Sequence, residues 1–578
     1  MTERLEQEVV AAAAGTDEIR SQKRQLDPES TTTGAAPVTN EDVVTDEAGA
    51  KRARFDDSVT RNKDGKKKWE RRDRRGTGRS EENTASDPSS SSSSADRLPK
   101  RKVAVKFGYC GIGYSGLQIN PGVKTIEGDI FEAFCTAGAV SADNAVNPNK
   151  VGLQRAARTD RGVHAAGNLL SLKLILQPEG LKEGETLVDK VNSLLPEFIR
   201  IWGITRVQNG FNARQSCDSR MYEYLLPTYV FIPPKPGSTM HDMLLRMRTE
   251  ELAKEGSDGK SKLDDIVEHP FWAEQGTSHD FSTDIAAKKK YRLPPAALQR
   301  IRSIFAHYSG SHNFHNFTVG KEFRDRSCHR FMKQLTISDP KMIQDAEWVS
   351  IKFHGQSFML HQIRKMIGLL VLVGRTGAGE GLVDECFGPA RVHIPKAPGL
   401  GLLLERPIFD AYNTRIRNNN DKISRLMRKK SQSKSEAETE APPTESKSDQ
   451  SEAGKASSLQ DELREFISYN SHTSAMETFK QQWIYDRIIA TEHETNEFGK
   501  WLNYLDVFQG PDFEFLNPKG VIPPEAIVKV GEFHRDQLRR KKEAQDKDAA
   551  GENGAEDEEE EDSEAYGMKG AQLDEYEG

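Results

Sequence analysis

The stretch RAARTDRGVHAAGNLLSLKL, residues 155–174, carries most of the information about fold and function. It places Asp160 between two arginines, with Gly162 and His164 close behind and an apolar run directly after them. Glycine permits a turn beside Asp160 that other residues resist, and the apolar run predicts a buried strand. An aspartate flanked by arginines can stay ionised in a pocket shielded from water. Spacing alone is equally satisfied by an ordinary turn, in which Asp160 caps the backbone and the arginines are at the surface.

Patterns typical of strands and helices alternate on both sides of this stretch. Alternating or continuous apolar runs predict strands at 103–110, 168–178, 199–207, 219–230, 333–339 and 348–355. Helical spacing of apolar residues predicts helices at 125–140, 186–196, 294–308 and 358–374, the first with Thr125 as its N-cap. The sequence therefore predicts an α+β fold in which one sheet is backed by helices.

Composition divides the 578 residues into ordered and disordered parts. Hydrophobic residues make up 35% and charged residues 30%, which is too little apolar content for a chain that is globular throughout. The predicted parts are a disordered region with basic clusters (1–99), an N-terminal half of the core that carries Asp160 (100–230), an insertion with a partly disordered middle (231–290), a C-terminal half (291–413), a disordered linker (414–457), a helical extension (458–510) and a charged, acidic disordered tail (536–578).

The net charge of −7 conceals a basic core. Residues 100–413 contain 41 Lys and Arg against 33 Asp and Glu, a balance of +8, whereas residues 549–578 contain one Lys against 12 acids. A basic core suits a polyanionic partner, although domains that bind no nucleic acid also reach this charge. Five cysteines without a CxxC pair predict a reducing compartment. No apolar run approaches the roughly 18 residues of a membrane span.

Three basic clusters lie in or beside the N-terminal region: KRAR (51–54), KKKWERRDRR (66–75) and PKRKV (99–103). Any one of them is adequately explained as part of a solvated, charged tail. Together they favour a nuclear import receptor as a partner and the nucleus as the location, with PKRKV at the boundary of the ordered core.

RTDRGVHA (158–165) is one of six distinctive motifs spread along the chain. The other five are GYSGLQ (113–118), TIEGDIFEAF (125–134), FNARQSCDSRMYEY (211–224), FMLHQIRKMIG (358–368) and APGLGLLLE (397–405). In type and order they resemble the motifs of the tRNA pseudouridine synthase A family, although GYSGLQ lacks the usual Trp. GSHNFHNFT (310–318) and the helical extension resemble the eukaryotic, multi-site nuclear branch of that family, in a fungal-like form.

The resemblance implies a pseudouridine synthase fold, in which two halves share a mainly antiparallel sheet. It implies an isomerase that converts uridine to pseudouridine without a cofactor, mainly at several anticodon stem-loop positions of tRNA, with snRNA and mRNA as further candidates. By analogy Asp160 is the nucleophile, and the target base is flipped out of its stack. Arg158 helps to extrude the base, Tyr222 stacks on the uracil, Arg364 pairs with Asp160 and Leu402 forms an apolar wall. Whether Asp160 acts at the base or at the sugar stays open.

Some residues and alternatives are not decided by the motifs. His164 is expected to be structural. His312 with His315, and Cys328 with His329, suggest a structural zinc ion, although the four do not amount to a ligand set and the chemistry needs no metal. A non-catalytic RNA-binding protein on the same fold and a DNA-binding nuclear protein are the rival hypotheses. The insertion and the extension favour a monomer.

Overall fold

The computed structural model describes residues 98–253, 260–440, 462–508 and 510–528. Residues 1–97 of the region predicted to be disordered (1–99), residues 254–259 in the middle of the predicted insertion, and the predicted tail at 536–578 lie outside these residues, as do the basic clusters at 51–54 and 66–75. No helix in the described ranges is long and apolar enough to cross a membrane.

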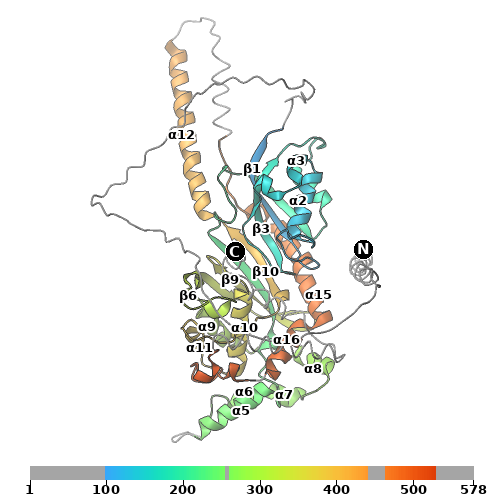
Figure 1. The fold of residues 1–578 in the computed structure, drawn as a ribbon, viewed down its shortest axis with the longest axis vertical. Coiled ribbons are helices and arrows are strands. Elements are labelled where there is room, and N and C mark those ends of the chain that lie inside the picture. The colour runs from blue at the N-terminus through green and yellow to red at the C-terminus, as the bar shows by residue number, and fades with distance from the viewer. Residues whose placement is uncertain (1–97, 254–259, 441–461, 509, 529–578) are drawn as a thin grey trace, which may run out of the picture. The chain divides into compact units, whose positions relative to one another are not determined.

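One large sheet organises the described chain (Figure 1). Its main path runs β4-β1-β3-β10-β5-β9-β7-β6, with β2 added to β3 and β8 added to β9. The strands are β1 (Lys100–Tyr109), β2 (Gln154–Arg155), β3 (His164–Ile175), β4 (Ile199–Arg206), β5 (Ser219–Pro227), β6 (Gly310–Asn313), β7 (His329–Ile337), β8 (Lys341–Ile343), β9 (Ala346–Gly355) and β10 (Leu402–Ile408).

The pairing of β10 joins the two halves of the sheet. β10 runs parallel to β3, with Leu403 opposite His164, and antiparallel to β5, with Leu404 opposite Tyr222. The other pairings described are antiparallel. The α+β class and the mainly antiparallel shared sheet are therefore confirmed. β5, predicted within the N-terminal half, lies between β10 and β9, because its hydrogen bonds go to strands from the far end of the chain.

The α-helices of the described residues include those predicted from helical spacing. They are α2 (Ile126–Thr136), α3 (Ala142–Ala145), α4 (Leu187–Leu194), α5 (Thr239–Leu252), α6 (Asp264–Val267), α7 (Pro270–Gln275), α8 (Phe281–Lys288), α9 (Pro295–Ala306), α10 (Gln362–Thr376), α11 (Leu382–Glu385), α12 (Asp410–Glu440), α14 (Thr473–Phe479), α15 (Asp486–Thr495) and α16 (Glu497–Val507). α2 begins at the predicted N-cap, where the Thr125 side chain accepts a hydrogen bond from the Gly128 amide. α10 is apolar on nearly all sides and buried along most of its length, so it forms the centre of the C-terminal half.

The linker predicted at 414–457 is wrong over its first part, because α12 continues to Glu440. The composition is rich in charged residues, which suggested disorder, but no glycine or proline interrupts residues 411–441. Tyr412 and Ile416 are buried and attach the start of the helix to the core. Residues 441–457 lie outside the described ranges.

The helical extension is attached to the central strands by buried charges. Lys480 begins a π-helical segment, Lys480–Tyr485, and is 2% exposed. Its ammonium lies 3.3 Å from a carboxylate oxygen of Glu223 on β5 and 2.9 Å from one of Glu405 on β10. Glu223 also accepts a hydrogen bond from the Tyr485 hydroxyl at 2.8 Å. The extension is thus bound to the two strands that carry Tyr222 and Leu402.

A second buried ion-pair group joins the insertion, α10 and the extension. Arg375 at the end of α10 is fully buried and contacts Asp506 of α16 at 2.5 Å. Lys288 of α8 contacts Asp284 at 2.6 Å and donates to the Asn503 side chain of α16. Both cations are therefore compensated, as burial requires.

The basic cluster at 99–103 is part of the sheet. β1 begins at Lys100 and pairs with β3 from its first residue. Lys102 is 9% exposed and donates to the Gly152 carbonyl at 3.1 Å. A paired strand cannot at the same time lie in the groove of an import receptor, so this cluster does not support the prediction of nuclear import.

Candidate active site

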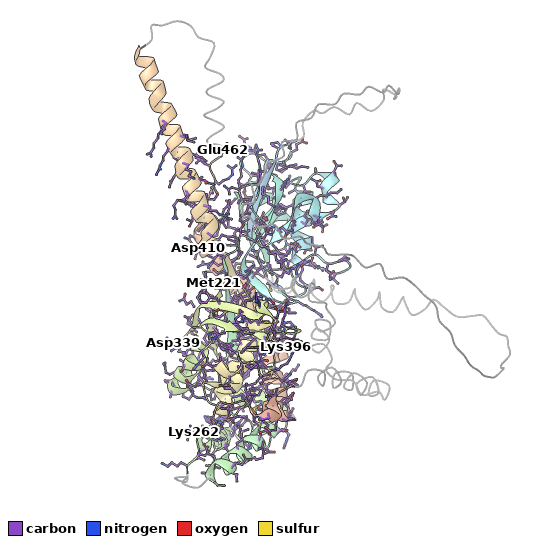
Figure 2. All side chains as sticks on the ribbon, turned by 60° about the vertical axis from the view of Figure 1, so that its left-hand side comes forward. Met221, Lys262, Asp339, Lys396, Asp410 and Glu462 are labelled. Atoms are coloured by element: carbon purple, nitrogen blue, oxygen red, sulfur yellow. The ribbon has the colours of Figure 1, made fainter. Side chains whose placement is uncertain are left out.

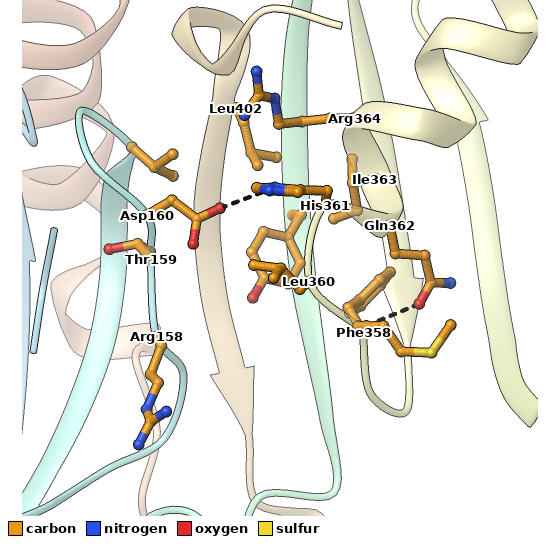
Figure 3. A pocket seen from close by; sticks show the side chains of 13 residues that line it. Arg158, Thr159, Asp160, Phe358, Leu360, His361, Gln362, Ile363, Arg364 and Leu402 are labelled. Carbon is orange, nitrogen blue, oxygen red and sulfur yellow. Dashed lines mark hydrogen bonds and ion pairs between the residues drawn. The ribbon is translucent and has the colours of Figure 1, made fainter. Parts of the chain in front are cut away.

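A pocket opens where the starts of β3 and β10 meet the N-terminal end of α10 (Figure 3). The space between its lining atoms is about 520 Å³, which includes open solvent at its mouth. Its lining consists of Arg158, Thr159, Asp160, Val163, Tyr222, Phe358, Met359, Leu360, His361, Gln362, Ile363, Arg364 and Leu402. The structure therefore brings together all five residues that the sequence nominated.

The loop that carries Asp160, residues 156–163, is held at several points. Arg220 on β5 donates to the Ala156 carbonyl at 2.7 Å, and Asn168 on β3 donates to the Ala157 carbonyl at 3.0 Å. The Asp160 carbonyl accepts the Val163 amide at 3.2 Å, in a turn that Gly162 completes at a φ of +75°. A residue other than glycine would be strained at that φ. The backbone around Asp160 is thus fixed before any substrate arrives.

The turn at 113–119 supports the same loop from the other side. The Leu117 amide donates to the Thr159 carbonyl at 3.2 Å. Glu127, fully buried in α2, accepts the Ile119 amide at 3.0 Å and Arg155 Nε at 2.8 Å. These contacts link two of the sequence motifs to the residue that lies just before the loop.

His361 is the direct side-chain neighbour of the Asp160 carboxylate. Its Nδ1 lies 3.7 Å from Asp160 Oδ2, as the dashed line in Figure 3 shows. His361 is 7% exposed and occupies the N-cap position of α10 with a φ of +59°. A left-handed backbone is uncommon for a residue with a side chain, and such residues concentrate at functional sites.

The ion pair that the family resemblance implied between Arg364 and Asp160 is not formed among the described residues. Arg364 is 6% exposed, and its Nε donates instead to the Ala397 carbonyl at 2.6 Å. The Ala397 amide returns a hydrogen bond to the Arg364 carbonyl. Because its guanidinium is engaged with this backbone, Arg364 acts on Asp160 through its positive charge at a distance, and His361 makes the close contact.

The surroundings keep Asp160 ionised. Burial alone raises the pKa of its carboxyl group, but the contact with His361 and the positive charges of Arg364 and Lys396 outweigh burial, so the pKa of Asp160 is lowered. The side chain is 32% exposed, so the carboxylate can be reached from the mouth of the pocket. An ionised, accessible carboxylate among apolar walls is suited to nucleophilic or proton-transfer chemistry.

Tyr222 and Leu402 form a wall of the pocket. Tyr222 is 8% exposed, and its ring meets that of Phe358 edge to face at 5.0 Å. Burial and the nearby Asp160 raise the pKa of the Tyr222 phenol to about 12, although Arg220 opposes them, so the phenol is neutral at ordinary pH. Leu402 is also 8% exposed and begins β10. A flat aromatic ring beside apolar side chains can receive a planar base.

Arg158 has a separate place at the rim. It is half-buried and extends away from the Asp160 carboxylate, as Figure 3 shows. This direction leaves the Asp160 carboxylate uncovered by the Arg158 side chain.

Sequence reasoning missed His361 and Phe358, although both lie inside the quoted motif at 358–368. The signal available was a histidine three residues before the buried Arg364, at the start of the predicted helix. The helix begins at Gln362 instead of 358, and His361 occupies its N-cap position.

The other histidines serve the fold. His164 is fully buried, and its Nδ1 accepts the Gly111 amide at 3.2 Å. Burial lowers the pKa of His164 to about 4, so it is neutral and structural, as expected. The suggestion of zinc is not supported, because no group of three or more His, Cys, Asp or Glu in the described ranges could hold a metal ion. His312 stacks on Phe387 instead, at 4.2 Å.

Fold and pocket together define an enzyme that places one ionised aspartate beside an aromatic wall. The family described as tRNA pseudouridine synthase matches residues 304–410. "tRNA pseudouridine synthase 1" of Yarrowia lipolytica is 42% identical over 459 residues, which cover 74% of this chain and 78% of the relative. The protein of the same name from Saccharomyces cerevisiae is 43% identical over 64% of this chain and 71% of its own. "tRNA pseudouridine(27/28) synthase" of Saccharomyces cerevisiae is 40% identical over 54% of this chain and 85% of its own.

The chain belongs to the tRNA pseudouridine synthase family, and it is an isomerase. The resemblance inferred from the six motifs is thereby confirmed, including its fungal character.

Proposed function

We propose that the protein isomerises uridine to pseudouridine in tRNA, with Asp160 as the catalytic group. The observation that carries the proposal is the placement of an ionised Asp160 in the same pocket as Tyr222 and Leu402. The names of the relatives support tRNA as the substrate.

The reaction balances within the substrate. The bond between N1 and C1′ of the uridine breaks, the uracil turns in the pocket, and a bond forms between C5 and C1′. The proton that leaves C5 is replaced by one on N1, so no atom is gained or lost overall. Asp160 begins the cleavage by attack on the base or by action at the sugar, and both routes need it ionised.

The surrounding residues serve the steps before and after bond cleavage. A base must leave its stack at a cost of about a few kcal/mol. Arg158 at the rim helps to replace it in the RNA, and the Tyr222 ring with Leu402 encloses the uracil while it turns. Since Tyr222 stays neutral, its hydroxyl can pass a proton without adding a negative charge next to Asp160.

The proposal also concerns which uridines are modified. The family resemblance favours several positions in the anticodon stem-loop, and one relative is named for positions 27 and 28. Spliceosomal small nuclear RNA and messenger RNA are further candidate substrates. Mapping pseudouridine across total RNA after deletion of the gene identifies the positions directly.

A direct test compares the Asp160→Ala protein with the unaltered chain on tRNA that carries tritium at C5 of uridine. Tritium release requires loss of the C5 hydrogen, so the unaltered chain should release it and Asp160→Ala should not, while both bind tRNA. Asp160→Asn is the matched variant, because it keeps the size of the side chain and removes its charge. Release by either variant at the rate of the unaltered chain refutes the assignment.

We also make proposals about the location of the protein and its oligomeric state. We propose import into the nucleus through the clusters at 51–54 and 66–75, since the third cluster lies in β1. We also propose a monomer, because the extension already occupies Glu223 and Glu405 on the central strands. Sedimentation of the full chain tests the second point, and fluorescence of a chain with both clusters neutralised tests the first.

A further inference from the structure

One side of α12 carries four basic residues, together with Asn418 and the exposed Leu426. Arg415, Lys422, Arg425 and Lys429 are all exposed. At 3.6 residues per turn, Arg415, Lys422 and Lys429 repeat every seven residues and Arg425 lies about 40° to one side of Lys429, so the four share one face of the helix. We refer to these four residues as the basic face. Figure 2 shows the side chains along this helix, with Asp410 labelled at its start.

The opposite side of α12 is fixed to the protein. Tyr412 and Ile416 are buried in a small cluster that includes Phe409. Asn413 exchanges two hydrogen bonds with the backbone of Ile467, each of 2.9 Å. Asn420, seven residues further on, exchanges two with the backbone of Arg464. These anchors fix the rotation of the helix about its own axis, so the basic face is held away from the core.

The charges of this helix differ from those of an ordinary solvated surface helix. Residues 410–429 hold six Lys and Arg against two acids, Asp410 and Asp421. α5 provides the comparison, since its two arginines are neutralised: Arg246 contacts Glu250, and Arg248 contacts Asp264 at 2.6 Å. A row of like charges costs self-repulsion that a polyanion would relieve.

We propose that the basic face of α12 binds the phosphate backbone of a helical stem in the substrate RNA, outside the pocket. The inference rests on the proposed function for the identity of the RNA. A duplex stem presents closely spaced phosphates along its length, which matches four cations spread over 14 residues of helix, or about 21 Å. An acidic protein is the alternative partner, and the test below separates the two.

Strand β10 connects the pocket to α12. Leu402 lines the pocket and begins β10, and α12 starts two residues after β10 ends (Figure 1). The seven residues of β10 span about 23 Å, and the basic face lies about 8 to 29 Å along α12. A stem of RNA reaches across such distances when its target uridine is in the pocket. Binding there would set the register of the RNA without touching the reacting base.

The test changes all four residues to Gln in the full chain and uses a full-length tRNA and a minimal stem-loop cut from it. We expect the KM for the full tRNA to rise at least about 10-fold with kcat within about 2-fold of the unaltered chain, and the KM for the stem-loop to stay the same. The slope of log Kd against log salt should flatten by about 0.9 for each phosphate that is no longer neutralised, or about 3.6 for four.

A matched control carries the same change of charge elsewhere. Lys182, Lys262, Lys341 and Lys500 are exposed on four different parts of the fold and share no face. Their replacement by Gln should leave the KM and the salt slope near those of the unaltered chain. An equal loss of affinity in both variants would mean that net charge alone is responsible and would overturn the proposal.

The remaining outcomes also decide the matter. If the basic-face variant binds tRNA with an unchanged Kd and salt slope, the face does not contact RNA. Loss of nuclear accumulation with unchanged tRNA binding would assign the face to a protein partner and refute the RNA contact. Measuring Kd in an Asp160→Ala background separates binding from catalysis. If the unaltered chain forms no pseudouridine but the face still governs tRNA binding, the proposed function fails and this inference stands.

Discussion

Replacement of His361 by Asn tests whether the close partner of Asp160 controls its ionisation. Asn is the suitable substitute, because it tolerates the left-handed backbone that His361 adopts at a φ of +59° and carries no charge. The change therefore removes the contact at 3.7 Å without new strain at the start of α10. We expect a slower reaction. As the pH falls, the variant should lose activity at a higher pH than the unaltered chain does.

The magnitude follows from the distance. When His361 is protonated, its charge and that of the Asp160 carboxylate, 3.7 Å apart, interact by about 4.5 kcal/mol at an effective dielectric constant of about 20. Since Asp160 is 32% exposed, water screens this value, and we take about half, roughly 2 kcal/mol. At 1.36 kcal/mol for each pKa unit, the pKa of Asp160 should rise by about 1.5 in the variant.

The direction of the pKa shift of Asp160 determines the pH profile. In the unaltered chain the pKa of Asp160 is lowered, so the carboxylate stays ionised and active until the pH falls through that lowered value. Without His361, the increase in pKa that burial causes is opposed less strongly. The carboxyl group of Asp160 therefore takes up a proton at a higher pH. The acid limb of kcat should therefore move up by about 1.5 pH units, and kcat on its plateau should fall about 10-fold because the carboxylate is less well oriented.

The assay is single-turnover pseudouridine formation from about pH 3, which is needed to reach the acid limb of the unaltered chain, to pH 8.5, with the melting temperature measured in parallel. Gln344, in the turn between β8 and β9, supplies the control, because it has a similar positive φ of +55° and does not line the pocket. Gln344→Asn should leave rate and profile unchanged. An unmoved acid limb in His361→Asn, with the fold intact, would refute the role given to His361.

Three further predictions concern the support of the site. Lys480→Met leaves Glu223 and Glu405 buried without their cation, so the free energy of unfolding should fall by about 3–5 kcal/mol in urea titrations; an unchanged midpoint would contradict this. Burial lowers the pKa of His164 to about 4 from about 6.5 in the unfolded chain, so stability should be complete above pH 6.5 and fall by about 3 kcal/mol on the way to pH 4. His164→Gln should show a flatter curve, and equal slopes would argue against the assignment. Glu127→Gln keeps the acceptor for the Ile119 amide but weakens the contact with Arg155, so kcat should fall several-fold with KM unchanged in steady-state assays, whereas a change in KM alone would point to RNA binding.

Much of the site could be predicted because its residues lie in short, distinctive motifs. Asp160, Tyr222 and Leu402 each sit in a segment whose residue types are constrained by a turn, a strand or a close approach of backbones. The five nominated residues do meet in one pocket, and their chemical roles remain predictions. The direct pairing of Arg364 with Asp160 was not found, because sequence shows that a buried arginine needs a partner but not that a backbone carbonyl would serve as one; the charge of Arg364 still lowers the pKa of Asp160.

The helical regions show where local reasoning failed. Residues 414–440 are rich in charge and were expected to be disordered, yet they continue α12 because the buried Tyr412 and Ile416 anchor its first turns. Helices draw most of their stability from such tertiary packing, which a composition count does not register.

The sequence by itself predicted the α+β class and many of the strands and helices, because local periodicity acts over a few neighbours, and the resemblance of its motifs to a known family singled out Asp160. Only the tertiary structure decided which charges meet. His361 reaches Asp160, and Lys480 reaches Glu223, across separations of 201 and 257 residues. Those pairings depend on how β10 joins the two halves of the sheet and on where α10 begins. The strength of an electrostatic contact depends on the distance between the charges, and the sequence of a single segment does not reveal that distance.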